Sequence, residues 1–266
     1  MAGLHSSWRR LWALMALIAA AQLWQGPANA AEIDDDVILG ALVAEFHLSV
    51  AGSLLPDAGT GDGTINAGAV AGAVQLIALT GVTEAPQGPD SADLGKALDA
   101  FLAFAATLEP TRNPPLSAKL AREFACQLIG TDPVGHAALG STLKIDAAAA
   151  KACANEAEKA AADWNARLAP FRKGPGLTPP EGAGPLYVEI APVIDAANEA
   201  IAAALKSNRL YDNLAERLNA ELALPYGRML LVTECGGPNA FFNPDRREIV
   251  LCDERIAAWI AAQKKS

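Results

Sequence analysis

Histidines are the side chains with which this sequence could most directly bind a metal or accept a proton. There are three of them, His5, His47 and His136. A hydrolytic zinc site on a helix needs two histidines four residues apart, with a glutamate between them as general base. No two histidines here have that spacing. A site with one histidine and three carboxylates stays open, although no spacing indicates one.

Other catalytic patterns are also missing. The sequence has no Gly-x-Ser-x-Gly turn for a nucleophilic serine, and Asp57-Ala58-Gly59 is not the Asp-Thr-Gly or Asp-Ser-Gly loop of aspartic peptidases. It has no phosphate-binding Gly-rich loop with its lysine. His136 lies in a predicted loop, where no spacing indicates a catalytic partner. The residue types alone therefore predict no particular reaction.

The four cysteines are predicted to form two disulfides, because their number is even and the chain reads as exported. Four cysteines permit three pairings, between which the sequence cannot choose. The local pairing, Cys126–Cys153 and Cys235–Cys252, is favoured because each pair falls inside one plausible folding unit. Neither pair has the Cys-x-x-Cys spacing of a redox or zinc site.

Residues 1–30 are predicted to be a cleavable signal peptide. Arg9 and Arg10 precede an apolar stretch at 11–23, and Ala28-Asn29-Ala30 is a small-x-small cleavage site. The stretch is too short to span a bilayer, and no later segment is predicted to span one. The mature chain would have 19 basic and 30 acidic residues, a net charge of −11, which argues against nucleic-acid binding. We expect a periplasmic or secreted protein.

The first part of the mature chain is predicted to be helical. Residues 34–55 have apolar side chains at helical spacing, and we expect Glu45 on the exposed side. Residues 67–79 are almost all small or apolar, which is typical of a buried helix. Further helices, two of them starting at a serine cap, are predicted at 91–108, 117–130 and 147–168.

A stretch rich in Pro and Gly at 172–185 is predicted to be a linker, because it can hold neither a helix nor an interior strand. The chain thereby divides into a signal peptide (1–30), a helical region (31–171), the linker (172–185) and an α/β region (186–266).

The α/β region has alternating helix and strand signals. A strand is predicted at 186–190, and helices at 193–206 and 210–222. Residues 229–233 and 248–251 are β-like runs around a turn that contains Asn243-Pro244-Asp245, which predicts a hairpin closed by Cys235–Cys252. The predicted fold class is α+β, mainly α-helical with a small antiparallel β-sheet near the C-terminus.

The hairpin segment also resembles a known family. Residues 234–245 read ECGGPNAFFNPD, and residues 247–254 read REIVLCDE. They resemble the signature of an exported bacterial family of unknown function labelled putative zinc metallopeptidases: Cys-Gly-x-x-Asn-Ala-aromatic-aromatic-x-Pro, then Ile-x-x-Cys-x-Glu. The segment around Cys126, Cys153 and 164–170 resembles the family's middle section. The resemblance implies at most a zincin-like fold, and it supports the local disulfide pairing.

The zinc site of that family would lie near the N-terminus, in an aromatic-His-Glu-x-x-His helix followed by Gly-x-Glu-Glu-Asp. This sequence departs from both motifs. His47 remains, but the positions of the general base, of the second histidine and of the acidic run are occupied by Leu48, Ala51, Ile65, Asn66 and Ala67. Without the second ligand and the base, zinc hydrolysis is not expected. We predict no catalytic residues and no bound metal, with zinc as the cofactor of the family only.

The retained signature has a second implication. Similar Asn-Ala-Phe strands in other zinc peptidases flank the substrate cleft, where an edge strand can pair with an extended peptide. The resemblance thus implies that Asn239, Phe241, Phe242 and Glu254 contact a peptide. Phe241 and Phe242 would point to opposite faces of a strand. The alternative is a disulfide-closed hairpin whose aromatic side chains simply pack.

Three functions remain from the sequence. The first is a non-catalytic exported relative of these peptidases, a pseudopeptidase that binds a peptide or an envelope protein. The second is an active metallopeptidase or other hydrolase with an unrecognised site. The third is a structural envelope protein. The first agrees best with a retained hairpin and missing ligands.

Overall fold

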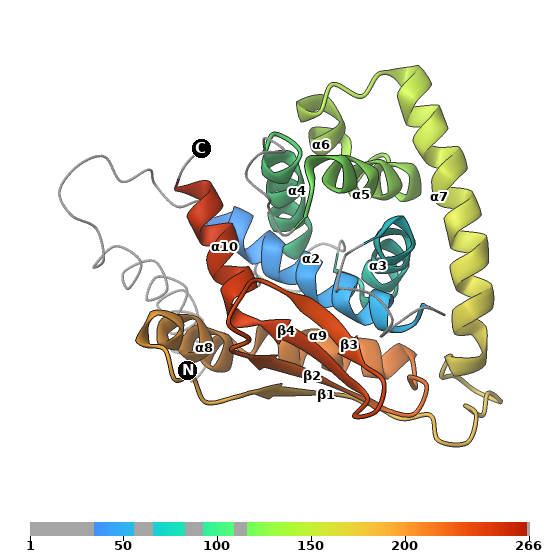
Figure 1. Cartoon of the computed structure of the whole chain (residues 1–266). Coiled ribbons are helices and arrows are strands. Elements are labelled where there is room, and N and C mark those ends of the chain that lie inside the picture. Colours follow the sequence, from blue (N-terminus) through green and yellow to red (C-terminus); the bar gives the residue numbers. More distant parts are fainter. Residues whose placement is uncertain (1–34, 56–65, 83–92, 109–115, 265–266) are drawn as a thin grey trace, which may run out of the picture.

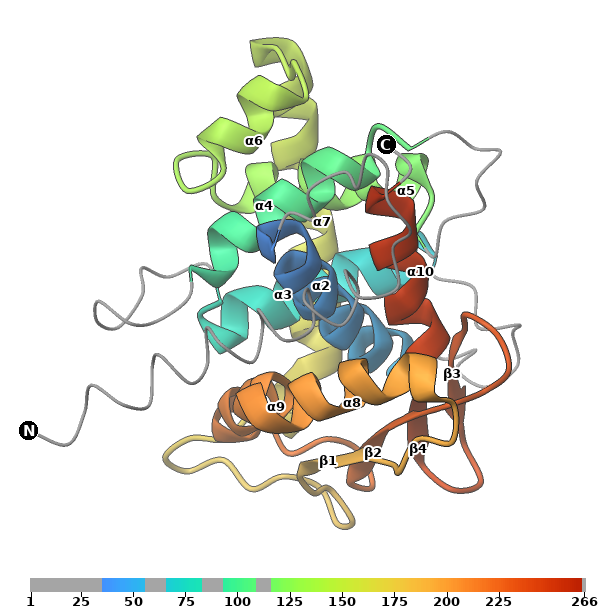
Figure 2. The same cartoon turned by 90° about the vertical axis from the view of Figure 1, so that its left-hand side faces the viewer.

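The protein has a layer of helices on one side of a four-stranded sheet. The computed structural model describes residues 35–55, 66–82, 93–108 and 116–264, so the predicted signal peptide lies outside the described residues. Figures 1 and 2 both place the described helices on the same side of the sheet. This mainly helical fold with a small C-terminal sheet confirms the predicted α+β class.

The helices before the linker follow the predicted pattern closely. Side-chain caps fix their starts: Asn66 accepts a hydrogen bond from the amide of Ala69, and Ser117 from that of Leu120. Asp93 caps the third helix, whereas the predicted cap Ser91 lies outside the described residues. The helices are α2 (Asp35–Ser53), α3 (Ala67–Thr80), α4 (Leu94–Ala105), α5 (Ala118–Thr131), α6 (Ala137–Thr142) and α7 (Ala147–Leu168), followed by the 3-10 turn η2 (Ala169–Phe171).

Helix α2 is the central element of the fold, with 15 of its 19 residues buried. It contacts α3 and α4 on one side and α10, β3 and β4 on the other. Gly40 permits the close approach to α4, because a Cβ there would lie 1.9 Å from the carbonyl oxygen of Ala97. Among the described helices, α2 alone is apolar and long enough to cross a membrane by length and composition, but 83% of that window is buried inside the protein.

The residues after the linker form the sheet and three helices. Residues 172–185 contain no helix or strand, only isolated bridges at Arg172 and Gly184. The elements that follow are β1 (Leu186–Ile190), α8 (Ala196–Asn208), α9 (Leu210–Glu221), β2 (Arg228–Thr233), β3 (Ala240–Asn243), β4 (Glu248–Cys252) and α10 (Asp253–Gln263).

The strand order, β1-β2-β4-β3, corrects the predicted hairpin. The two runs expected to be its arms, β2 and β4, are parallel neighbours, with Leu231 beside Val250. The antiparallel hairpin consists instead of β3 and β4, and β1 also runs parallel to β2. The physical reason is that the segment between β2 and β4 contains a strand of its own. The chain passes β4's position, returns as the edge strand β3 and then inserts β4 between the two.

The two faces of the sheet differ in their cover. Inner side chains such as Leu230, Val232 and Leu251 are fully buried and belong to one core with α2 and α9. On the outer face, Tyr187 of β1 and Phe241 of β3 are exposed. No described helix covers that outer face (Figure 2).

Candidate functional site

His47, which is expected at the position of the family's first zinc histidine, is a fully buried core residue. Its Nδ1 lies 2.8 Å from the carbonyl oxygen of Val43, one turn earlier on α2. Because a carbonyl only accepts, Nδ1 carries the hydrogen. Burial lowers the pKa of His47 to about 4, although the bond to Val43 opposes this shift. The ring is therefore neutral at pH 7, and its Nε2 lies 3.2 Å from the Thr80 hydroxyl at the end of α3.

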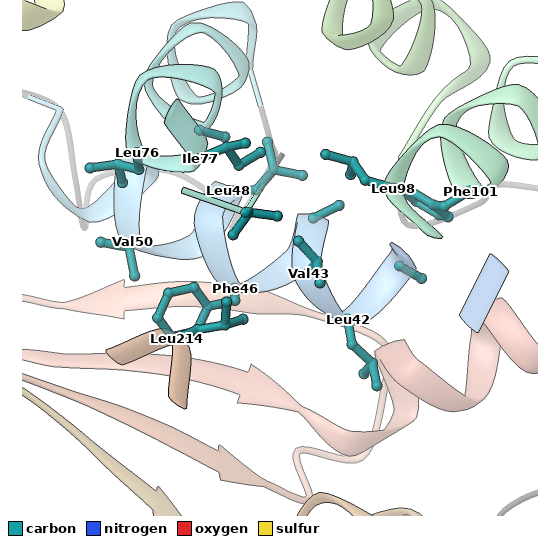
Figure 3. Close-up of a cluster of buried hydrophobic side chains, with 14 of the residues drawn as sticks. Leu42, Val43, Phe46, Leu48, Val50, Leu76, Ile77, Leu98, Phe101 and Leu214 are labelled. Carbon is teal, nitrogen blue, oxygen red and sulfur yellow. The ribbon is translucent and has the colours of Figure 1, made fainter. Parts of the chain in front are cut away.

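The neighbouring motif positions also face the core. Leu48 is 2% exposed and Ala51 is 0% exposed. Figure 3 shows Leu48 in one cluster with Leu76 and Ile77 of α3. These side chains fill the space where the family's glutamate and second histidine would need room for a metal and a water.

Two of the three positions at which the acidic run of the family is expected lie at the start of α3. Asn66 caps this helix, with its Oδ1 2.9 Å from the amide nitrogen of Ala69, and Ala67 is the first helical residue. Ile65 lies outside the described residues. Neither described position offers a carboxylate, and the side-chain oxygen of Asn66 is already bonded.

These residues do not fit a zinc ion. A catalytic zinc needs three protein ligands and one open position. The described motif positions supply only His47, whose Nδ1 already donates to a carbonyl and whose Nε2 faces the Thr80 hydroxyl. Of the described residues, the three His, Cys, Asp or Glu side chains that do converge are Cys235, Cys252 and Glu254, and both cysteines are in a disulfide.

Glu45 is buried, not exposed as predicted. Its carboxylate accepts a hydrogen bond from Arg255 Nε at 2.7 Å and one from Trp259 Nε1 at 2.9 Å, both on α10. The sequence could not reveal this pair, because its members are 210 residues apart. Nearby, burial raises the pKa of Tyr211 well above its usual value, with Glu45 adding to the effect. The pair anchors the C-terminal helix to the centre of the core.

His136 has a structural partner that the sequence did not indicate. Its Nδ1 lies 2.7 Å from Oδ1 of Asp99 on α4, and the His136 side chain is almost fully buried. The bond ties the turn before α6 to α4. Because the His136 ring is buried and bonded between these two elements, the pair has a structural role.

A groove of about 750 Å³ lies on the outer face of the sheet, beside the retained family signature. Leu231, Val250 and Phe241 form its floor in one row across β2, β4 and β3. The loop 234–239 closes one end, and Arg246, ion-paired with Glu248 at 3.0 Å, lies at the turn between β3 and β4. The groove thus contains residues of the signature rather than residues of α2.

Several bonds hold the loop 234–239 in place. Glu254 accepts hydrogen bonds from the backbone amides of Cys235, at 3.1 Å, and Gly236, at 2.7 Å. Glu234, which sequence reasoning missed, accepts from the amides of Ile194 and Asp195 before α8, and these bonds lower its pKa. Both disulfides are present, Cys126–Cys153 and Cys235–Cys252, in the local pairing.

The four residues expected to contact a peptide lie around β3, but their side chains differ in role. Phe241 is 38% exposed and lines the groove, whereas Phe242 packs against the core, with the guanidinium carbon of Arg228 4.3 Å from the centre of its ring. Asn239 lines the groove, and its Oδ1 accepts from the Ala240 amide at 2.8 Å. Glu254 is not among the residues that line the groove, and it contacts the loop 234–239 by accepting hydrogen bonds from the amides of Cys235 and Gly236.

Asp253, the first residue of α10, was also missed from the sequence. It is buried, and burial raises its pKa to about 6, with Glu254 and Glu234 adding to the shift. Its Oδ1 has no hydrogen-bond partner among the described residues. An acid that follows directly on a strand reads in the sequence as an ordinary helix start, so no signal marked it.

Comparison with known proteins gives one match. The model of a family described as putative metallopeptidase matches residues 191–265, from the segment before α8 to the end of α10. The matched residues include the loop 234–239, β3 and β4, and they do not include α2. Neither the curated proteins nor the solved structures contain a significant match. Residues 191–265 therefore match the putative metallopeptidase family, which confirms the resemblance for this C-terminal part of the chain.

Proposed function

We propose that this protein is a non-catalytic, exported relative of the putative metallopeptidases, and that it binds an extended peptide along β3. The observation that carries the first half is the burial of the motif positions. His47 is bonded inside the core, and Leu48 and Ala51 replace a base and a ligand with packed hydrocarbon. The two disulfides agree with a periplasmic or secreted location, where such bonds persist.

The second half is supported by the free edge of β3. Among the described residues, β3 pairs with β4 alone. The amide of Cys252 donates to the carbonyl oxygen of Asn239, and in an antiparallel ladder alternate residues face the partner. Phe241 and Asn243 then bond to β4, and the N–H and C=O of Phe242 face away from it.

That edge offers a peptide both backbone and side-chain contacts. An added strand would bond to the outward backbone groups of Phe242, while its alternate side chains would lie beside Phe241 and the groove. Ala240 contributes less, because its N–H is already bonded to the Asn239 side chain. The bound peptide would be extended, with every second residue apolar.

Fluorescence polarisation with a labelled alternating peptide, (Val-Thr)3-Val, tests this proposal. We expect saturable binding to the oxidised protein that a chelator does not change, with the peptide recovered intact by mass spectrometry. Phe241→Ala should weaken binding by about tenfold, or about 1.4 kcal/mol, which is typical of an aromatic residue at the centre of an interface.

Tyr187→Ala is the matched control, because Tyr187 is an exposed aromatic on the same face of the opposite edge strand, β1. It should bind the peptide like the wild type. Equal weakening by both variants, or no binding at all, would contradict the peptide site. Chelator-sensitive cleavage of the peptide would contradict the non-catalytic assignment.

A further inference from the structure

Cys235, Cys252 and Glu254 form a cluster whose possible metal ligands, two sulfurs and a carboxylate oxygen, all lie within 4.8 Å of one another. In the oxidised protein the two sulfurs are bonded to each other and offer no thiolate. The thiolate is the form of cysteine that binds zinc. The cluster is separate from the motif positions on α2, and one of its members, Cys235, lines the groove on the outer face of the sheet.

We propose that reduction of the Cys235–Cys252 disulfide turns this cluster into a zinc site with three protein ligands. Cysteine thiolates and carboxylates both bind zinc, and a zinc ion with an open position needs only three protein ligands. The fourth position would be open, because Cys235 is exposed and lines the groove on the outer face of the sheet. Cys252 and the partly buried Glu254 supply the other two ligands from the end of β4 and the first turn of α10.

The cluster does not depend on the disulfide for its position. Cys252 is fully buried, and its amide donates to the carbonyl oxygen of Asn239 at 3.0 Å. On the other side, Glu254 holds the amide of Gly236, and Glu234 holds the amides before α8. The loop is thus fixed at both ends by non-covalent bonds. After reduction the two thiols and the carboxylate remain neighbours.

The reduction can be carried out with a phosphine, which leaves no competing thiol. The phosphine attacks one sulfur and the S–S bond breaks. Water then supplies the oxygen of the phosphine oxide, and both sulfurs end as thiols. Each zinc ion that binds afterwards displaces the two thiol protons, so binding strengthens as pH rises.

The second disulfide provides an internal comparison. Cys126 and Cys153 join α5 to α7, and among the described residues no third His, Asp or Glu converges on their sulfurs. Cys153 is also buried. If zinc binding needed only a reduced cysteine pair, both pairs would bind it equally. If it needs the carboxylate, only Cys235 and Cys252 will.

The experiment measures zinc bound by the full protein before and after phosphine treatment, by competition with a chromophoric chelator under nitrogen. We expect no zinc at the cluster in the oxidised protein and one per chain after reduction. Cys126→Ser/Cys153→Ser should still bind one zinc, and Cys235→Ser/Cys252→Ser should bind none. Cobalt in place of zinc should give the thiolate charge-transfer absorption only in the proteins that keep Cys235 and Cys252.

Glu254→Gln covers the case in which a cysteine variant fails to fold, because it keeps both disulfides and an oxygen that can accept from the loop. It should weaken zinc binding to the reduced protein by about tenfold or more, since loss of even an outer-shell partner costs 10–100-fold. Unchanged affinity in Glu254→Gln, zinc retained by Cys235→Ser/Cys252→Ser, or no zinc after reduction would each overturn the proposal. The peptide experiment uses oxidised protein, so the two tests fail independently.

Discussion

Helix α2, where the zinc motif of the family is expected, and the loop-β3-β4 segment, which has the retained signature, lie in opposite environments. The positions of the zinc motif on α2 are inside the core, where a neutral histidine, a leucine and an alanine pack against α3. The retained segment lies at the surface, beside a groove and with a free strand edge. The family model matches only the second segment.

This difference agrees with the proposal that α2 has lost the chemistry of the family and kept its place in the fold. A zinc site requires polar ligands and space for water at the centre of the fold. Buried polar groups stabilise a fold less than packed apolar side chains do. Once the ligands are replaced, apolar residues can close that space. The edge strand β3 would bind a peptide through its own backbone groups. Replacement of residues on α2 therefore need not affect it.

Restoring the family's glutamate is the strongest challenge to this comparison. Leu48→Glu would place a carboxyl group at a 2% exposed position without a charged partner. We expect a loss of about 4–7 kcal/mol in the free energy of unfolding, which corresponds to a pKa raised by 3–5 units. Phe241→Glu, on the exposed strand, is the control and should cost about 1 kcal/mol or less. Urea unfolding measures both, and similar losses would contradict a packed α2.

The buried ion pair gives the next largest effect. Arg255→Met leaves Glu45 charged and buried, which should destabilise the protein by about 3–5 kcal/mol. Glu45→Gln combined with Arg255→Met removes both charges and keeps an acceptor for Trp259 Nε1, so it should recover most of that loss. Unfolding of both variants in denaturant measures their free energies of unfolding. A double variant as unstable as the single one would mean that the charge is not the cause.

The pH dependence of the free energy of unfolding tests whether His47 is a buried, neutral residue. The unfolded chain binds a proton near pH 6.5, but the folded protein resists it until about pH 4. Stability from this group is therefore complete above pH 6.5 and decreases, by up to about 3 kcal/mol, as the pH falls towards 4. Asp253, whose pKa is raised to about 6, contributes with the opposite sign, since its stabilisation is present below pH 4 and lost as the pH rises through 6.

The test therefore measures the free energy of unfolding of the wild type and of His47→Leu as a function of pH. The contribution of Asp253 cancels in the difference between the two curves. The variant should lose less stability than the wild type between pH 6.5 and pH 4. Parallel curves would mean that His47 is accessible to protons in the folded state.

A smaller loss of stability is expected at Asn66, the cap of α3. Asn66→Ala removes the cap of α3 and should cost about 1 kcal/mol, whereas Asn66→Ser keeps an acceptor and should cost only a few tenths. Thermal melts followed by circular dichroism distinguish them. Equal melting temperatures for the two variants would show that the Asn66 side chain does not cap the helix in solution.

The features that were predictable from the sequence are local ones. The bounds of α7 and β1 agree with the predicted ranges 147–168 and 186–190, because caps and periodicity act over a few residues. The opposite directions of Phe241 and Phe242 follow from strand geometry in the same way.

The features that were not predictable depend on distant partners. Glu45 has helical spacing compatible with an exposed position, and only Arg255 and Trp259 on the last helix bring it inside. The β-like runs at 229–233 and 248–251 would suit a hairpin equally well, and only the pairing of β3 with β4 makes them parallel. The residues that line the groove all lie between Leu231 and Val250 in the sequence, but the strand order brings them onto one face.

The zinc content of the oxidised protein distinguishes a packed core helix α2 from a helix that carries a zinc site. Elemental analysis of mature protein, purified without added metal, chelator or reductant and shown to contain no free thiol, should give zinc at the background level. Zinc near one atom per chain that disappears in His47→Leu would contradict the account and restore a metal site to α2.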